Sequence, residues 1–485
     1  MIGKDSFCQL LRDNFPYEPT IQQSGLFDSL ASFMCCGPDV ADKIFVLKGY
    51  AGTGKTTIVG TLVKSLRKCG VHTVLLAPTG RAAHVMASYS GYPAVTIHKR
   101  IYRQKSITNP SCFVLAGNES SNTLFIVDEA SMIYASKATD AEFGSGSLLD
   151  DLMEYVYNGK GCRLMLIGDS AQLPPVGEKE SPALDIKMLS KDMFKQVEQY
   201  TLTQVMRQME NSGILRNATK LREFIAEYGP EQQILPVFRY KLKGVSDIKV
   251  ITSAELIEKI SDSYSRNGIE QTMIICRSNK RAGIYNEGIR NTVLGREEEL
   301  SSGDWLMIVR NNYYWVEKLG ADAPCNFIAN GDIVRVRRMR GDMEMYGFRF
   351  AKVTIEIPDY DNFEMDVNIL LETLHSPSPS LTAERSQELF QNVMTDYADL
   401  KSKTRRYQRL RENPYFNALQ VKYGYAITCH KAQGGQWNSV FIDQGYLAPD
   451  ATPDIDYYRW LYTALTRATG QVYLVNCPAD SIDPE

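Results

Sequence analysis

The most informative stretch of the sequence is Gly49-Tyr50-Ala51-Gly52-Thr53-Gly54-Lys55-Thr56-Thr57, which fits the pattern G-x-x-x-x-G-K-[ST]. The apolar run Ile44-Phe45-Val46-Leu47 comes just before it, and the helix-compatible residues 58–64 follow it. In this order, the glycines let backbone N–H groups converge on phosphate oxygens at the N-terminus of a helix. A chance glycine turn is the alternative, but it explains neither the strand nor the helix. The stretch therefore predicts a binding site for a nucleoside triphosphate.

Expected ligands for this nucleotide lie in the loop and upstream of it. Lys55 is expected to reach the β- and γ-phosphates, and the Thr56 hydroxyl is expected to hold Mg²⁺. Gln22 and Gln23 each offer an amide that donates to and accepts from an adenine edge, although a surface glutamine is the other interpretation. ATP and Mg²⁺ are therefore the predicted cofactors. The predicted nucleotide-binding residues up to this point are Gln22, Gln23, Gly49, Ala51, Gly52, Thr53, Gly54, Lys55, Thr56 and Thr57.

The composition excludes several classes of protein. Of the 485 residues, 44% are hydrophobic and 23% are charged, as is usual for globular domains. The net charge of −3 argues against a basic surface overall but not against a local basic groove. The ten cysteines show no C-x-x-C spacing, so reduced thiols are expected and a metal centre is not. No apolar run has the ~18 residues of a membrane span. No signal peptide is visible at the start, so a cytoplasmic protein without membrane contact is expected.

Two carboxylates follow the apolar run Leu124-Phe125-Ile126-Val127. Asp128 is expected to hold Mg²⁺, directly or through water, and Glu129 to orient or deprotonate the attacking water. A solvated acidic turn is the alternative interpretation. Because the pair ends a strand expected in the same sheet as the phosphate loop, a catalytic role is favoured.

Two other apolar runs of the first half also end in polar motifs. Residues 74–77 lead to Pro78-Thr79-Gly80-Arg81, and residues 164–167 lead to Gly168-Asp169-Ser170-Ala171-Gln172. Strands that alternate with helices predict a parallel sheet, whose ligands gather at the carboxyl ends of the strands. Gln172 is therefore a candidate sensor of the γ-phosphate.

The second half repeats this arrangement. Residues 272–276 lead to Arg277-Ser278-Asn279, residues 421–427 lead to Thr428-Cys429-His430-Lys431, and residues 460–468 are expected to form a helix that includes Arg467. Arg207 lies in another motif near the end of the first half. Arginines stabilise the charge that spreads over the γ-phosphoryl oxygens in the transition state. An arginine from a second domain would make domain closure depend on the nucleotide.

These patterns predict an α/β protein with a first α/β domain at residues 1–207 that carries an inserted hairpin or loop at about 100–121. A second α/β domain is expected at residues 208–334 and 419–485. Residues 335–418 read as an inserted β-barrel-like domain with short β-rich runs. This insertion ends in a basic helix that either contacts a nucleic-acid backbone or is a solvated face. The basic residues are Lys401, Lys403, Arg405, Arg406, Arg409 and Arg411.

The ordered motifs GYAGTGKT, APTGRAA, TIH, DEAS, GDSAQLPPV, LTQVMRQ, YAITCHKAQGG and WLYTALTRA resemble those of superfamily 1 helicases. More narrowly, they resemble the 1B branch, which includes RecD-like, Dda-like and Pif-type DNA helicases. The resemblance runs from about Thr20 to Val475. Residues 152–163 lack the Arg- and Gly-rich signature of Pif-type members, so the RecD-like or Dda-like label is preferred.

The resemblance implies a probably known architecture only in the sense of the family: two RecA-like domains, a strand-separating hairpin and an SH3-like barrel. It implies a monomeric motor that moves 5′→3′ on single-stranded DNA and acts at single-strand/duplex junctions. The ATP-site positions it implies are Gln22 or Gln23, Lys55, Thr56, Asp128, Glu129, Gln172, Arg207, Gly434 and Arg467. The DNA-facing positions it implies are Pro78, Thr79, Gly80, Arg81, His98, Lys99, Asn279, Thr428, His430 and Lys431.

Other interpretations stay open from the residues themselves. His98 and His430 also suit core or capping histidines, and a threonine at a strand-to-helix junction is commonly an N-cap. At the level of function, the alternatives are an ATPase that acts on RNA or displaces bound proteins, and a nucleotide switch without enzymatic activity. The switch is disfavoured by Glu129, Arg207 and Arg467.

Overall fold

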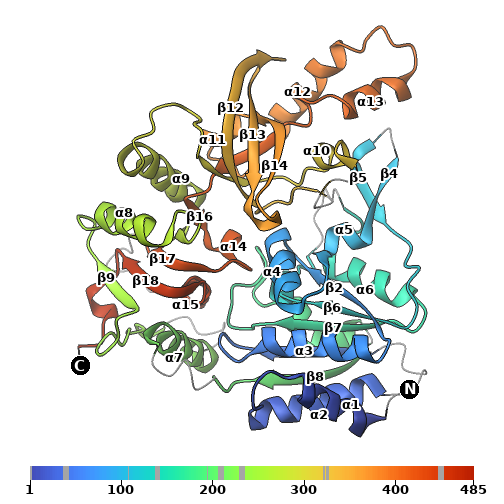
Figure 1. The fold of residues 1–485 in the computed structure, drawn as a ribbon, viewed down its shortest axis with the longest axis vertical. Coiled ribbons are helices and arrows are strands. Elements are labelled where there is room, and N and C mark those ends of the chain that lie inside the picture. Colours follow the sequence, from blue (N-terminus) through green and yellow to red (C-terminus); the bar gives the residue numbers. More distant parts are fainter. Residues whose placement is uncertain are drawn as a thin grey trace.

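The computed structural model describes residues 3–35, 43–106, 109–136, 143–193, 195–205, 212–228, 235–320, 323, 327–445 and 453–484. Within these residues, two parallel sheets lie side by side and a closed β-barrel stands above their junction (Figure 1). A two-stranded hairpin sheet projects from the first of them. The predicted fold class, two RecA-like α/β units with an inserted hairpin and an inserted barrel, is confirmed.

The first sheet has six parallel strands in the order β3-β2-β6-β7-β1-β8. These strands are β1 (Lys43–Gly49), β2 (His72–Ala77), β3 (Ala94–Thr96), β6 (Thr123–Val127), β7 (Arg163–Gly168) and β8 (Gln196–Leu202). Continuous Val, Ile, Leu and Phe runs form the central strands because helices cover both faces of the sheet. One face packs on α1 (Lys4–Asn14), α2 (Ile21–Cys35), α3 (Lys55–Lys68) and α4 (Gly80–Ser90). The other face packs on α5 (Ile97–Ile101) and α6 (Leu148–Asn158).

The hairpin expected within residues 100–121 is present. It consists of β4 (Tyr102–Ser106) and β5 (Asn109–Leu115), which pair antiparallel. At its base, the N–H of Ala116 donates to the Ile101 carbonyl at 2.7 Å, which ties the returning strand to the end of α5. The hairpin is therefore anchored in the first sheet's helical layer.

The second sheet has five parallel strands in the order β16-β10-β17-β18-β9. These strands are β9 (Ile248–Ile251), β10 (Thr272–Cys276), β16 (Ala426–Thr428), β17 (Trp437–Asp443) and β18 (Ala468–Val475). One face packs on α7 (Gly213–Tyr228), α14 (Cys429–Ala432) and α15 (Ile455–Leu465). The other face packs on α8 (Leu256–Asn267) and α9 (Asn279–Gly288), and its core continues into the barrel.

The barrel extends beyond the expected residues 335–418. Its strands are β11 (Trp305–Ile308), β12 (Ile333–Met345), β13 (Phe348–Ile357), β14 (Phe363–Leu370) and β15 (Leu419–Tyr423). β11 and β15 come from the flanking chain, and they pair with each other and with the outer strands β12 and β14. Without them, β12 and β14 would be open edges, so closure of the barrel requires the two flanking segments.

The apolar run 421–427 was expected to form one strand, and this expectation is wrong in one respect. The run divides between β15, which belongs to the barrel, and β16, which belongs to the second sheet. Gly424 lies between them, where a Cβ would come within 3.2 Å of the Leu306 carbonyl carbon. The glycine allows the chain to pass close to β11 as it leaves the barrel for the sheet.

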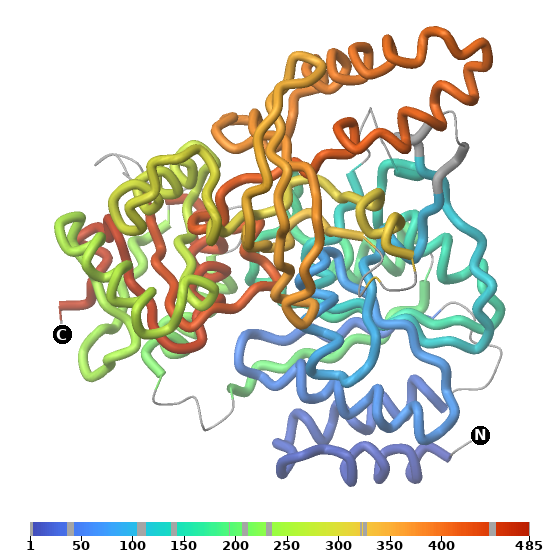
Figure 2. The backbone as a smooth tube through the Cα atoms, turned by 45° about the horizontal axis from the view of Figure 1, so that its top comes forward, coloured from blue at the N-terminus to red at the C-terminus, as the bar shows by residue number. Residues whose placement is uncertain are grey.

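A helical arm extends from the barrel and consists of α12 (Ala383–Thr395) and α13 (Lys403–Arg411) (Figure 2). Two short helices, α10 (Tyr314–Glu317) and α11 (Glu372–His375), complete the helices of the barrel region. The arm has a small core in which Phe348 and Phe350 meet Leu389, Val393 and Leu410. On the basic helix, Arg406 donates to backbone carbonyls and Arg409 pairs with Glu412 at 3.2 Å. Contact of this helix with nucleic acid stays a prediction.

No helix in the described part of the chain combines the length and the hydropathy needed to cross a membrane.

Candidate active site

The phosphate loop connects β1 to α3 as predicted. Gly52 and Gly54 adopt φ values of +78° and +84°, which favour glycine. A Cβ at Gly49 would approach Lys55 Cδ to 2.9 Å, so glycine leaves room for the lysine side chain. Lys55 Nζ donates to the carbonyl of Tyr50 at 3.1 Å and also to that of Gly49. The loop, its lysine and the start of α3 therefore form a cradle of the shape and charge that phosphates require.

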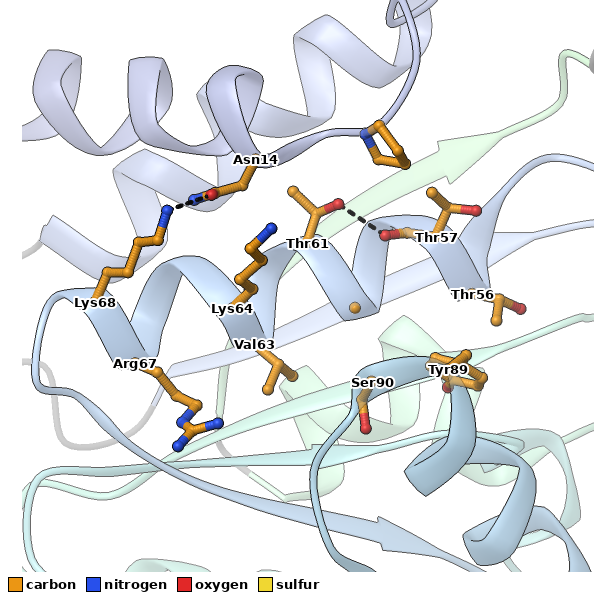
Figure 3. Close-up of a pocket in the computed structure, with 12 residues that line it drawn as sticks. Asn14, Thr56, Thr57, Thr61, Val63, Lys64, Arg67, Lys68, Tyr89 and Ser90 are labelled. Carbon is orange, nitrogen blue, oxygen red and sulfur yellow. Dashed lines mark hydrogen bonds between the residues drawn. The ribbon is translucent and has the colours of Figure 1, made fainter.

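A pocket of about 660 Å³ runs from this cradle along the exposed face of α3 (Figure 3). Thr56, Thr57 and Tyr89 line it near the phosphate loop, and basic side chains line it further along the helix. Lys68 Nζ donates to Asn14 Oδ1 at 2.6 Å, which connects the far end of the pocket to the end of α1. The side of the loop that carries the Thr56 hydroxyl is therefore open and positively charged.

Both glutamines expected at adenine are engaged with protein groups. Gln22 Oε1 accepts from the N–H groups of Thr203 and Gln204, each at 2.9 Å, which ties α2 to the segment after β8. Gln23 is buried, and its Nε2 donates to the Thr53 carbonyl at 3.3 Å. A Cβ at Gly54 would lie 2.9 Å from the same Nε2. Gln23 thus supports the phosphate loop from below, and a contact of either amide with adenine stays a prediction.

The two carboxylates lie where β6 ends. Asp128 Oδ2 accepts a hydrogen bond of 2.6 Å from the hydroxyl of Tyr89 on α4, and its Oδ1 accepts one of 2.8 Å from the N–H of Glu129. Glu129 has a φ of +51°, an uncommon conformation for a residue with a side chain. Burial raises the pKa of the Glu129 carboxyl, while the cation of Arg467 opposes this rise. A carboxylate held in this way is suited to act as a base.

The motif after β7 contributes two side chains. Gln172 is buried, and its Oε1 has no hydrogen-bond partner among the described residues. This acceptor fits a water molecule that attacks, or lies beside, a γ-phosphate. Asp169 is also buried, which raises the pKa of its carboxyl, while Lys55 acts in the opposite direction. The N–H of Ala171 donates to Asp169 Oδ1 at 3.0 Å. The donor set of the site therefore fits a nucleotide and its attacking water.

The second sheet completes this site through α15 and the turn after it. The Tyr462 hydroxyl donates to Asp169 Oδ2 at 2.6 Å and accepts from the Ala51 N–H at 3.2 Å. Arg467 Nη1 lies 4.0 Å from Glu129 Oε1. Nε of the same guanidinium donates to the Thr463 carbonyl at 3.1 Å, which fixes its direction. Arg207, the other predicted arginine, lies outside the described residues.

Further contacts join the two sheets beside the nucleotide site. The N–H of Leu173 donates to Thr463 Oγ1, and Gln433 Nε2 donates to the Leu173 carbonyl, both at 2.9 Å. Gly434, a predicted nucleotide ligand, lies against α4, where a Cβ would come within 2.9 Å of Ala82 Cβ. Its contact with a nucleotide stays a prediction, and its observed contact is with the first domain.

The predicted DNA-facing residues fall into three groups. Thr79 Oγ1 accepts from the Ala82 N–H at 3.2 Å, so this threonine caps α4, as the alternative interpretation held. The guanidinium of Arg81 stacks on Trp437 at 4.2 Å from the ring centroid. Gly80 lies against the barrel side of the junction, since a Cβ there would be 2.7 Å from Asp332 Oδ1. These residues follow β2, and Pro78 precedes them in the same loop.

His98 and Lys99 form the second group, on α5. The ring of His98 packs at 5.6 Å from that of Tyr102 and at 5.1 Å from that of Phe143. Burial lowers the pKa of His98 to about 4, so its imidazole is neutral at pH 7. The N–H of Lys99 donates to Thr96 Oγ1 at 3.2 Å, which caps α5. His98 therefore has the surroundings of a core histidine and offers no positive charge to a phosphate.

The third group comes from the second sheet. Asn279, Thr428 and Lys431 line one pocket of about 180 Å³ between α9 and the barrel. Burial lowers the pKa of both Lys431 and His430, which follow β16 on the short helix α14. The structure thus brings together three of the four predicted residues from this half in one concave surface.

Sequence reasoning missed Tyr89, Asp169, Gln433 and Tyr462. Asp169, Gln433 and Tyr462 stand inside motifs that were identified, but nothing in those motifs shows which side chains cross to the other sheet. Tyr89 lies at the end of α4 and carries no motif signal. Its contact with Asp128 depends on how α4 packs on the sheet.

A phosphate loop in one parallel sheet, faced by a tyrosine and an arginine from a second, defines a two-domain P-loop ATPase. The family model for an AAA domain matches residues 39–227, and that for the UvrD-like helicase C-terminal domain matches residues 423–475. The chain belongs to superfamily 1B of the DNA helicases and is related to RecD2, Dda and Pif1. It is thus an enzyme of the ATP-dependent helicase class.

Two curated relatives illustrate the similarity. The ATP-dependent RecD2 DNA helicase of Deinococcus radiodurans is 23% identical over 462 residues, which cover 93% of this chain and 48% of that protein. The ATP-dependent DNA helicase dda of Enterobacteria phage T4 is 23% identical over 458 residues, which cover 88% of this chain and 93% of that protein. The chain therefore spans about half of the RecD2 relative and nearly all of the phage relative.

Among solved structures, the Pif1 helicase from Bacteroides in complex with ADP-AlF3 and ssDNA aligns with a TM-score of 0.47 and 16% identity. The alignment covers 96% of this chain and 95% of that one. Pif1 helicase from Candida albicans aligns with a TM-score of 0.45 and 14% identity over 97% of each chain.

Proposed function

We propose that this protein moves 5′→3′ along single-stranded DNA and separates duplex DNA, driven by ATP-dependent closure of its two RecA-like domains. The observation that carries the proposal is the shared nucleotide site. Tyr462 and Arg467 of the second domain reach Asp169 and Glu129 of the first. A ligand bound at Lys55 would therefore change the contacts that hold the two domains together.

The chemistry of this proposal rests on residues whose surroundings suit each role. Lys55 and the amides of the phosphate loop would bind the phosphates, and Thr56 and Asp128 would hold Mg²⁺. Bound Mg²⁺ supplies charge neutralisation at the β- and γ-phosphates. Glu129 would orient the attacking water and accept its proton, with Gln172 as a second acceptor. Arg467 would stabilise the charge of the transition state from the second domain.

The path proposed for DNA crosses the carboxyl ends of both sheets. On the first domain it includes the loop after β2 with Thr79, Gly80 and Arg81, and on the second it includes Asn279, Thr428 and Lys431. The two regions adjoin, because Arg81 stacks on Trp437 of β17 and Gly434 packs against α4. The hairpin β4–β5 is proposed to separate the strands ahead of the motor, and the protein is proposed to act as a monomer at single-strand/duplex junctions.

The experiment that tests the direction is strand displacement on partial duplexes that carry either a 5′ or a 3′ single-stranded tail. With ATP and Mg²⁺, we expect displacement from the 5′ tail and none from the 3′ tail. Lys55→Ala serves as the control for dependence on hydrolysis. Displacement from the 3′ tail alone would overturn the direction and keep the motor.

A second measurement tests the choice of nucleic acid. We expect single-stranded DNA to stimulate ATP hydrolysis more than RNA of equal length and sequence. Equal stimulation would contradict the DNA-specific part of the proposal. DNA-stimulated hydrolysis without strand displacement would instead favour a translocase that displaces bound proteins.

A further inference from the structure

The pocket between the second sheet and the barrel has features beyond the predicted DNA-binding residues. It holds about 180 Å³ and lies between α9 and the segment that joins α11 to the barrel (Figure 1). Asn279, Thr428 and Lys431 line one side. The barrel side is lined by Lys422 of β15 and by the chain after α11. Lys422 matches no motif that the sequence suggested.

Positive charge exceeds negative charge in this pocket. Lys280, Lys422 and Lys431 line it, and Glu287 is the single carboxylate among its described lining residues. Glu287 already has a partner, because its Oε1 lies 3.2 Å from Nδ1 of His375. The pocket therefore has three ammonium groups and no carboxylate left to neutralise them.

The two lysines deepest in the pocket lack an acidic partner. Lys422 Nζ donates to the Ser376 carbonyl, a neutral acceptor. Lys431 Nζ has no hydrogen-bond partner in the described part of the chain. Burial and the nearby charge of Lys431 lower the pKa of Lys422 to about 8. Two cations held close together in partial burial favour the binding of an anion between them.

Neutral donors in the same pocket suit an oxyanion. Thr428 precedes α14 without capping it through its side chain. Asn279 opens α9, a helix of 10 residues whose N-terminus carries partial positive charge. Two lysines, a hydroxyl, an amide and a helix N-terminus are the groups that bind phosphate in proteins.

We propose that Lys422 and Lys431 together hold one phosphate group, and that this phosphate belongs to the backbone of the single strand that crosses the second sheet. The inference rests on the proposed function and adds a barrel residue to it. Only Gly424 and Tyr425 separate β15 from β16, so a phosphate held by Lys422 and Thr428 links the barrel to the sheet. The barrel thereby contributes to holding the strand during translocation.

Binding of a labelled oligothymidylate to the full chain without nucleotide tests this proposal. The affinity is measured against salt concentration at pH 7 for wild type, Lys422→Met, Lys422→Arg and Lys249→Met. Each lost phosphate contact on a single strand lowers the slope of log Kobs against log salt by about 0.7. We expect this loss, with weaker binding, in Lys422→Met. Lys422→Arg retains the charge and should retain the slope. Lys249 is exposed on β9, at the opposite edge of the sheet, and its variant should match wild type.

Proton uptake provides a second readout that a merely structural role would not change. At pH 8, a lysine with a pKa of about 8 is half deprotonated, and a bound phosphate raises its pKa. Wild type should therefore take up protons on binding DNA, as measured by calorimetry in buffers of different ionisation enthalpy. Lys422→Arg should take up fewer protons, because arginine is already charged. The other charged groups that face Lys422 are Lys280, Glu287, His375 and Lys431, and all of them are present in every variant.

The outcomes are distinguishable. An unchanged salt slope in Lys422→Met, with thermal stability equal to wild type, overturns the inference while the proposed function stands. If wild type does not bind the oligonucleotide at all, the proposed function itself fails. Titration with inorganic phosphate alone separates the two sources of the anion. Proton uptake with inorganic phosphate that the oligonucleotide does not compete away would overturn the assignment to a backbone phosphate.

Discussion

The hydroxyl of Tyr462 donates a hydrogen bond of 2.6 Å to the carboxylate of Asp169, across the boundary between the two sheets. The same hydroxyl accepts from the N–H of Ala51 in the phosphate loop at 3.2 Å. One buried oxygen atom thus connects the loop, the motif after β7 and α15. Since phosphate-loop amides bind phosphate oxygens, a nucleotide would compete for one of these contacts.

Tyr462→Phe should weaken the coupling between nucleotide binding and domain closure. The change removes both hydrogen bonds and leaves the buried Asp169 carboxylate without one donor, at a cost of roughly 1–3 kcal/mol. We expect kcat for DNA-stimulated ATP hydrolysis to fall about tenfold or more, as measured by steady-state kinetics. Tyr457→Phe is the matched control, because it removes the buried hydrogen bond from Tyr457 to Gln444 on the same helix. Equal effects of the two variants would contradict a specific role for Tyr462.

Lys55→Ala should abolish hydrolysis and leave binding of single-stranded DNA largely intact. The variant loses a cation that is expected to stabilise the phosphates, and loss of one such group typically costs about 10²–10³ in rate. The measurement pairs ATP hydrolysis with fluorescence anisotropy of labelled DNA. Retained turnover would remove Lys55 from the site.

Glu129→Gln should trap ATP on the enzyme. The amide preserves the shape of the side chain but cannot accept a proton, and a general base contributes about 10²–10⁴ in rate. We expect labelled ATP to stay bound through gel filtration in the presence of DNA. Rapid conversion of the bound ATP to ADP would show that another residue is the base.

Arg467→Gln should change the pH dependence of hydrolysis as well as its rate. Burial raises the pKa of Glu129, and Arg467 opposes this rise, so loss of the guanidinium raises the pKa further. A base acts only when deprotonated, and the acid limb of the kcat profile should therefore move to higher pH. Arg467→Lys keeps a charge and should shift the limb less. An unmoved acid limb in Arg467→Gln would separate the arginine from Glu129.

Asp332→Asn should remove a pH-dependent loss of stability. Burial raises the pKa of Asp332 to about 7, above its ordinary value of 3.8. The folded state therefore binds the proton more tightly than the unfolded state. This group makes the protein less stable as pH rises from about 4 to 7, by up to roughly 4 kcal/mol. The asparagine keeps an acceptor for the Ala329 N–H, which donates to Asp332 at 2.7 Å.

The measurement for Asp332 is the melting temperature at pH 5.5 and pH 8. We expect Asp332→Asn to melt at a higher temperature than wild type at pH 8, with a smaller difference between the variants at pH 5.5. Asp342→Asn, an exposed carboxylate on β12, is the control. A pH dependence identical to that of wild type would show that Asp332 is not the group responsible.

Much of the site could be predicted because its parts are local. The phosphate loop follows β1 directly, and Asp128 and Glu129 follow β6 directly, so an apolar run and the residues after it place each group. The same holds for β13, whose bounds, Phe348–Ile357, are those expected from the run of apolar and β-branched residues. The glutamines upstream were harder to interpret, since an amide serves equally well as a nucleotide contact or as a brace for the loop.

The sequence by itself determined the identity of the sheets, the P-loop and the acid pair, because hydrophobic runs and turn residues act over a few positions. Only the tertiary structure decided that β11 and β15 close the barrel, that Tyr462 meets Asp169, and that Lys422 joins Lys431 in one pocket. These pairs form when segments distant in the chain pack together, and burial of one surface against another selects them. No local pattern encodes which distant partner a side chain will meet.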